Sequence, residues 1–130
     1  IEFRNCVVEC PRREGMRVYD KAASGVDVRF TNCHWSNTWS DPPEKAGGPQ
    51  SPLLLDLRRP QITREQGGVT FDACYVYDTV DRPVLAITEK ESEFGARNVF
   101  GTLRVVSPYT PRMEPGPNPK EVAVELVHIP

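Results

Sequence analysis

The chain has 130 residues, 38% of them hydrophobic, and a formal net charge of -2 at pH 7. This length suits one domain with a modest core, and the small negative charge gives no reason to expect nucleic acid as a partner. No apolar run approaches the roughly 18 residues of a membrane-spanning helix, so no membrane span is expected. Thirteen prolines and nine glycines separate short runs rich in Val, Ile, Phe and Tyr, which is typical of an all-β chain.

One phrase occurs three times along the chain, as IEFRNC, VRFTNC and VTFDAC. The alignment superposes Phe3, Phe30 and Phe71, then Asn5, Asn32 and Ala73, then Cys6, Cys33 and Cys74. Phe30 follows Phe3 by 27 residues, and Phe71 follows Phe30 by 41. The Pro- and Gly-rich residues 40–50, with a smaller expansion at 58–68, account for the longer interval.

Each phrase predicts two short strands joined by a sharp corner. Alternation puts Val28 and Phe30 on one face of the first strand. Cys33 and Trp35 likewise share a face of the second strand, which makes Trp35 a core residue. Asn32 lies between them and tolerates the left-handed backbone of a tight bend.

A third strand follows each phrase, at residues 16–19, 53–57 and 84–87. A fourth unit is expected in residues 101–109, with Leu103 in the Phe position and Val106 in the Cys position. A single unit cannot pair its own backbone, so we expect each unit to form one turn of a three-sided coil that stacks in parallel on the next.

The last part of the chain differs in character. Five prolines between positions 108 and 119 predict an extended linker over residues 109–120, and the alternation of Val122, Val124 and Leu126 predicts a closing strand. We therefore expect coils in residues 1–109 and a Pro-rich segment with a closing strand in residues 110–130. An antiparallel β-sandwich would also suit this length, but it does not explain why Phe, Asn and Cys recur together.

The three phrases and their Asn corner resemble right-handed parallel β-helix proteins of the pectate-lyase-like superfamily. The resemblance covers roughly residues 1–109 and implies an all-β, right-handed parallel β-helix of about three to four coils. It also implies a polysaccharide or glycan ligand, an extracellular or periplasmic location and, since Ile1 lies in mid-strand, the remainder of a longer β-helix upstream. Because the superfamily includes polysaccharide lyases, glycoside hydrolases and coils without chemistry, an enzyme and a non-catalytic scaffold or adhesin module both stay open.

In such proteins the polysaccharide site usually lies on the outer side of the first face, here the strands at 16–19, 53–57 and 84–87. With Met16, Leu53 and Val84 inward, the expected outer rows are Arg17, Leu54 and Leu85, and Tyr19, Asp56 and Ile87. Asp56 with Arg17 and Arg58 is the catalytic candidate, because guanidinium groups hold a carboxylate ionised or bind a uronate. The alternative is a surface ion pair.

The insertion at residues 34–50 is the second candidate region, and it would wall the same face. Trp39 is expected either to stack on a sugar ring or to dock the loop by hydrophobic contact. Asp41 and Glu44 are a candidate acid pair, and Tyr19 joins these three residues as a substrate-binding candidate.

The four cysteines allow two disulfides, or a column of stacked thiols at three of the four positions. Cys10 lies at a corner position outside that column. His34 and His128 have no second ligand at metal spacing, so neither a metal nor a cofactor is expected.

Overall fold

The computed structural model describes residues 1–19, 27–45, 50–56, 68–88, 98–116 and 122–130. These residues form two sheets and the short 3-10 helix η1 (Pro43–Lys45), with no α-helix among them. The strands are β1 (Glu2–Arg4), β2 (Val7–Glu9), β3 (Met16–Tyr19), β4 (Asp27–Thr31), β5 (His34–Ser36), β6 (Leu53–Asp56), β7 (Gly68–Tyr77), β8 (Leu85–Thr88), β9 (Asn98–Val106), β10 (Met113–Glu114) and β11 (Val122–Ile129).

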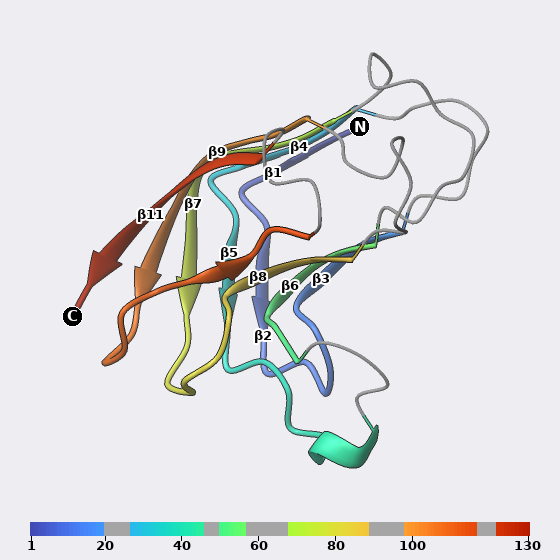
Figure 1. Ribbon diagram of the computed structural model, residues 1–130. Coiled ribbons are helices and arrows are strands. Elements are labelled where there is room, and N and C mark those ends of the chain that lie inside the picture. Colours follow the sequence, from blue (N-terminus) through green and yellow to red (C-terminus); the bar gives the residue numbers. More distant parts are fainter. Residues whose placement is uncertain (20–26, 46–49, 57–67, 89–97, 117–121) are drawn as a thin grey trace.

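Every strand pairing in the described residues is parallel, so the all-β prediction is confirmed and the antiparallel sandwich is excluded. The larger sheet joins β1, β4, β7, β9 and β11, and also β2, β5 and β7; the smaller sheet has the order β10-β8-β6-β3. Figure 1 shows β3, β6 and β8 side by side, as are β4, β7, β9 and β11.

The chain first contributes to the larger sheet and then crosses to the smaller one. It then returns to the larger sheet, where it adds the next neighbouring strand. We call each such excursion a pass: β1 to β3 form the first pass, β4 to β6 the second, β7 and β8 the third, β9 and β10 the fourth, and β11 begins the fifth.

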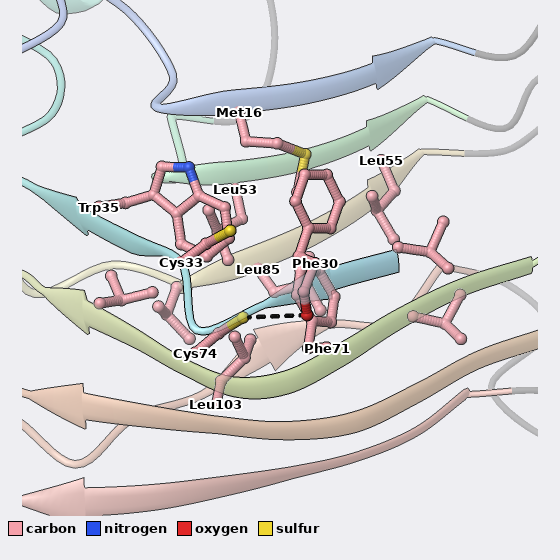
Figure 2. Packing of buried hydrophobic residues seen from close by; sticks show 14 of the residues in the cluster. Met16, Phe30, Cys33, Trp35, Leu53, Leu55, Phe71, Cys74, Leu85 and Leu103 are labelled. Carbon is pink, nitrogen blue, oxygen red and sulfur yellow. Dashed lines mark hydrogen bonds between the residues drawn. The ribbon is translucent and has the colours of Figure 1, made fainter. Parts of the chain in front are cut away.

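Three phenylalanines form a column through the first three passes. Phe3 is the register partner of Phe30, and Phe30 is the register partner of Phe71. Their rings are stacked, with centroids 5.2 Å apart in the first pair and 5.6 Å apart in the second. Trp35 is buried edge-on against Phe30, as predicted for a core residue (Figure 2). The recurrence of Phe in the sequence therefore reflects one position in successive layers.

The residues between the two strands of each phrase adopt the predicted left-handed corner conformation. Asn5, Asn32 and Ala73 have φ angles of 55°, 51° and 50°, the left-handed region that Asn tolerates better than most residues. The Nδ2 of Asn32 donates to the Oδ1 of Asn5 at 2.8 Å, so the corner side chains also form a ladder.

The four cysteines are free, so the disulfide alternative is not what the structure shows. Cys33 and Cys74 are buried, and each thiol donates to the carbonyl of the phenylalanine one pass earlier. The Sγ–O distance is 3.4 Å from Cys33 to Phe3 and 3.3 Å from Cys74 to Phe30. Figure 2 shows the second of these bonds. A small thiol therefore fills the core and fixes the register of neighbouring passes.

The predicted register of β8 is wrong by one residue. Leu85, rather than Val84, is level with Leu53, and Ile87 is level with Leu55. Leu85 and Ile87 consequently point into the core, and Ala86 takes the outer position. The four consecutive apolar residues from Val84 allow two alternations, and the larger side chains fill the core.

The predicted alignment of the fourth pass is also wrong. Gly101 is level with Phe71, and Leu103 is level with Cys74. The register shifts between these positions because β9 has one residue fewer than β7 there. Gly101 has a φ of 119°, and a Cβ at this position would overlap the carbonyl oxygen of Phe71. The fourth pass thus replaces the aromatic residue and its corner with a glycine that approaches β7 closely.

The Pro-rich tail supplies two further strands. Met113 and Glu114 pair in parallel with Leu85 and Ala86, so β10 interrupts the stretch that we expected to be a linker. Both residues have the N–H group that the prolines around them lack. The expected closing strand is present as β11, which pairs with β9 along its whole length. The boundary between residues 109 and 110 stays a prediction.

Gly101→Ala should lower the free energy of unfolding by more than about 3 kcal/mol, because the new methyl group meets backbone that has no room to move. Urea denaturation measures this loss. Thr102→Ala in the same strand is the control and should cost less than about 1 kcal/mol. Equal losses for the two variants would contradict the close approach of β9 to β7.

Alkylation by iodoacetamide should distinguish the two exposed thiols from the two buried ones. Burial raises the pKa of Cys74 and of Cys33, so at neutral pH these thiols are protonated as well as covered. We expect Cys6 and Cys10, which are exposed, to react in the folded protein, and Cys33 and Cys74 to react only in denaturant. Peptide mapping by mass spectrometry gives the order, and rapid labelling of Cys74 in the native protein would contradict the packing.

Candidate functional site

The structure brings the predicted pair Arg17 and Asp56 together on adjacent strands of the smaller sheet. The NH2 of Arg17 lies 2.9 Å from the Oδ2 of Asp56. The Asp56 side chain is only 2% exposed, whereas the Arg17 side chain is 39% exposed. The buried carboxylate of Asp56 therefore holds the guanidinium group of the more exposed Arg17. Arg58, the third catalytic candidate, lies outside the described residues.

Tyr19 joins this pair at the rim. It is level with Asp56 in the ladder, and the guanidinium carbon of Arg17 lies 5.1 Å from the centre of its ring. Tyr19 remains 48% exposed. Arg17 and Tyr19 together present a planar cation and an aromatic ring to solvent.

The middle of this outer face is buried. Leu54 and Ala86 occupy the row that begins with Arg17, and both are buried. Glu114 of β10 continues this row and is exposed, and Thr88 of β8, level with Asp56, is half-buried. The exposed side chains of this row therefore lie at its two ends, on β3 and on β10.

The segment that leads into β3 carries two charged residues that the sequence analysis did not single out. The Oε1 of Glu14 lies 3.8 Å from the NH1 of Arg17, and the Nε of Arg13 lies 3.7 Å from the Oε2 of Glu14. These contacts extend the Arg17 site toward the 34–50 insertion. The run of charged residues 12–14 directly before the outer strand was the signal that could have found them.

Trp39 is not the exposed ring that sugar stacking requires. It is 9% exposed, its Nε1 donates to the carbonyl of Ser51 at 2.8 Å, and the guanidinium carbon of Arg13 lies 5.5 Å from its ring centre. The alternative expectation, docking of the loop, describes its place in the structure. Its polar edge finds a partner and its ring is covered, so Trp39 positions Arg13 rather than meeting solvent.

Asp41 and Glu44 do not form an acid pair in the structure. The Oδ1 of Asp41 accepts from the Nε of Arg12 at 3.1 Å and lies 3.0 Å from its NH2. Glu44 lies in η1 and is exposed. Asp41 thus pairs with Arg12, and we call Arg12, Arg13 and Arg17 the arginine strip.

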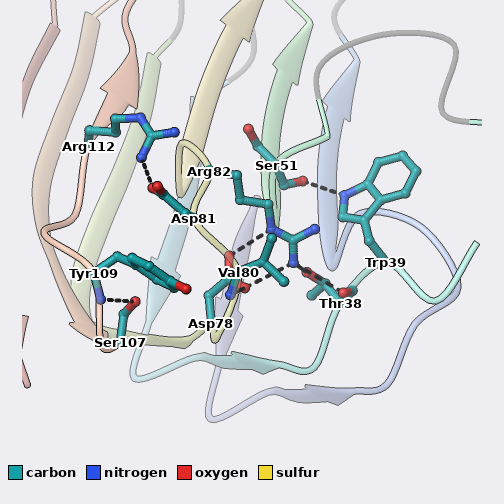
Figure 3. A network of polar contacts seen from close by, with 10 residues as sticks. All are labelled: Thr38, Trp39, Ser51, Asp78, Val80, Asp81, Arg82, Ser107, Tyr109 and Arg112. Carbon is teal, nitrogen blue, oxygen red and sulfur yellow. Dashed lines mark hydrogen bonds and ion pairs between the residues drawn. The ribbon is translucent and has the colours of Figure 1, made fainter. Parts of the chain in front are cut away.

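A second polar cluster, which the sequence reasoning also missed, is buried (Figure 3). Arg82 donates from Nε to the Oδ2 of Asp78 at 2.8 Å and from NH2 to its Oδ1 at 3.0 Å. The same NH2 lies 3.2 Å from the carbonyl of Thr38. Arg82 thereby ties the loop of the third pass to that of the second. An Asp at a corner position with an Arg four residues later was its sequence signal.

The arginine strip is suited to binding anions rather than to acid–base chemistry. Each carboxylate beside it, from Glu14, Asp41 and Asp56, already faces a guanidinium group. The guanidinium groups keep exposed donors, which match the planar carboxylates of acidic ligands. Across the described ranges, no three His, Cys, Asp or Glu residues form a group that could hold a metal ion.

Comparisons with known proteins found no matching family model, no matching curated protein and no matching solved structure. A search of the described residues found no helix with the length and apolar character to cross a membrane.

Arg82→Ala should be far more destabilising than Arg112→Ala. The Arg82 and Asp78 side chains are 9% and 7% exposed, so removing Arg82 strands a buried carboxylate at a cost of about 3–5 kcal/mol. Arg112 pairs with Asp81 in the open, and its loss should cost less than about 1 kcal/mol. Urea denaturation of both variants checks the contrast, and similar midpoints would refute the structural role of Arg82.

Proposed function

We propose that this chain forms coils of a right-handed parallel β-helix of the pectate-lyase-like kind. Support comes from the repeated passes, each adding strands to the two parallel sheets, and from the stacking of Phe, Asn and Cys on their counterparts. On this proposal the passes are the coils, and the loops between the sheets carry the function.

We further propose that the chain is the glycan-binding part of an extracellular carbohydrate-active protein, and that it takes an acidic polysaccharide along the arginine strip. The observation that carries this proposal is the Arg17 site. Asp56 and Tyr19 hold the guanidinium in one orientation while the Arg17 side chain stays 39% exposed. A preorganised guanidinium loses little side-chain entropy when it binds a uronate carboxylate.

Arg12 and Arg13 add two further exposed arginine side chains close to Arg17 in the chain. Their side chains are 77% and 48% exposed, and Asp41 and Trp39 restrain them. A polymer with carboxylates on successive sugars would meet several of these guanidinium groups at once, which strengthens binding through multivalency. Tyr19 offers an apolar ring for the sugar itself.

We propose binding without catalysis. A general base has to reach the proton that it removes, and the Asp56 side chain is 2% exposed beneath Arg17. A purely structural scaffold is the alternative function, and it predicts no glycan affinity at all.

Polygalacturonate should bind this protein, and added salt should weaken the binding. Arg17→Lys keeps the charge beside Asp56 but loses the planar fork, so we expect roughly tenfold weaker binding. Isothermal titration calorimetry with the polymer measures the change, and a neutral galactan should show no binding.

Arg104→Lys is the matched control for this experiment. Arg104 lies over Tyr75 with 5.5 Å between the guanidinium carbon and the ring centre, an arrangement like that of Arg17 and Tyr19 but on the larger sheet. Its replacement should leave the affinity unchanged. Equal losses from the two lysine variants would show that the polymer binds positive charge without a site.

A further inference from the structure

The first pass forms one end of the stack of strands in the described residues. β1, β2 and β3 are edge strands of their sheets, so one side of each ladder has no strand beside it in the described residues. Between them lies an apolar cavity of about 330 Å³. Its lining includes Phe3, Cys6, Val8, Met16 and Phe30. Phe3 is 43% exposed, whereas its stacking partner Phe30 is 5% exposed.

Two polar groups at this end indicate which hydrogen-bond acceptors a segment bound there would supply. Asn32 donates its Nδ2 to the Oδ1 of Asn5, but within the described ranges the Nδ2 of Asn5 makes no hydrogen bond. Cys33 donates to the carbonyl of Phe3 one pass earlier, whereas Cys6 reaches only the carbonyl of Arg4 in its own pass. Both groups at the open end lack the acceptor that an earlier pass supplies to later ones.

We propose that this end binds a polypeptide segment that runs parallel to β1 and β2 and carries the phrase apolar-x-aromatic-x-Asn-Cys. The aromatic ring would stack on Phe3, its carbonyl would accept from Cys6, and the Asn side chain would accept from Asn5. A basic residue before the aromatic one would lie level with Glu2, as Arg29 does in the second pass. The inference is independent of the proposed glycan site.

A second copy of the chain fits this end less well. An antiparallel copy with Phe3 facing Phe3 puts Asn5 opposite Ile1. A head-to-tail copy offers β11, which has Val124 at the level of Gly101 and Leu126 at the level of Leu103. That strand supplies neither an aromatic residue nor an Asn at the required positions.

The thiol of Cys6 reports occupation of this end. A peptide of residues 27–35 with Cys33→Ser serves as the probe. It keeps the apolar, aromatic and Asn positions of the phrase, and Ser in place of Cys avoids a competing thiol. Cys6 alkylation should become roughly tenfold slower once about nine-tenths of the protein is bound. Cys10 is exposed, lies beyond the C-terminal end of the docked peptide and should keep its rate.

Two peptide variants test the recognition itself. The same peptide with Asn32→Ala or with Phe30→Ala should protect Cys6 less, because each change removes one proposed contact without altering the protein. Asn5→Ala in the protein should have the same effect as the peptide's Asn32→Ala, and Ala73 shows that Ala fits this corner. Circular dichroism confirms folding of that variant.

Unchanged labelling of Cys6 at saturating peptide would overturn the proposal. It would also be overturned if the Asn32→Ala and Phe30→Ala peptides protected Cys6 as well as the peptide without these changes. Sedimentation velocity provides the remaining test. A dimer in which Cys6 is already protected would show that a second copy takes this end, and it would also reject the proposed occupant. Glycan affinity is measured separately, so failure here leaves the arginine strip unaffected.

Discussion

Every strand in the described part of this protein obtains its ladder hydrogen bonds from the pass before or after it. Parallel pairing fixes which residue lies over which, so the interior positions of successive passes have to fill one continuous core. The column of Phe3, Phe30 and Phe71 and the ladder of Asn5 and Asn32 follow from that constraint. The register is the interaction on which the remaining architecture depends.

The same constraint leaves the outward residues and the connections free to differ. Arg17 and Asp56 meet because adjacent passes bring β3 and β6 side by side. Trp39 and Arg82 then fasten the connections to the stack, one through the Ser51 carbonyl and the other through Asp78. Anchored connections allow exposed guanidinium groups to keep a defined orientation, which is what recognition of a charged polymer requires.

The sequence allowed prediction of features that repeat with the same chemistry. Phe, Asn and Cys at three equivalent positions indicated parallel stacking, and the outward alternation indicated Arg17 beside Asp56. Prediction failed where the pattern was ambiguous: Val84 to Ile87 permits two alternations, and Gly101 replaces an aromatic residue at a shortened corner. The burial of Trp39 depends on Arg13 and Ser51, which no local pattern connects to it.

The pairing of strands that are distant in the chain has a consequence for folding kinetics. Val99 and Val122 are 23 positions apart, and no other paired residues in the described ranges lie closer along the chain. Hairpins therefore cannot nucleate this ladder, and the first pairing bears the entropy of closing a long loop. We expect a slow initiation followed by faster growth on an existing edge, with misassembly between molecules competing during the lag.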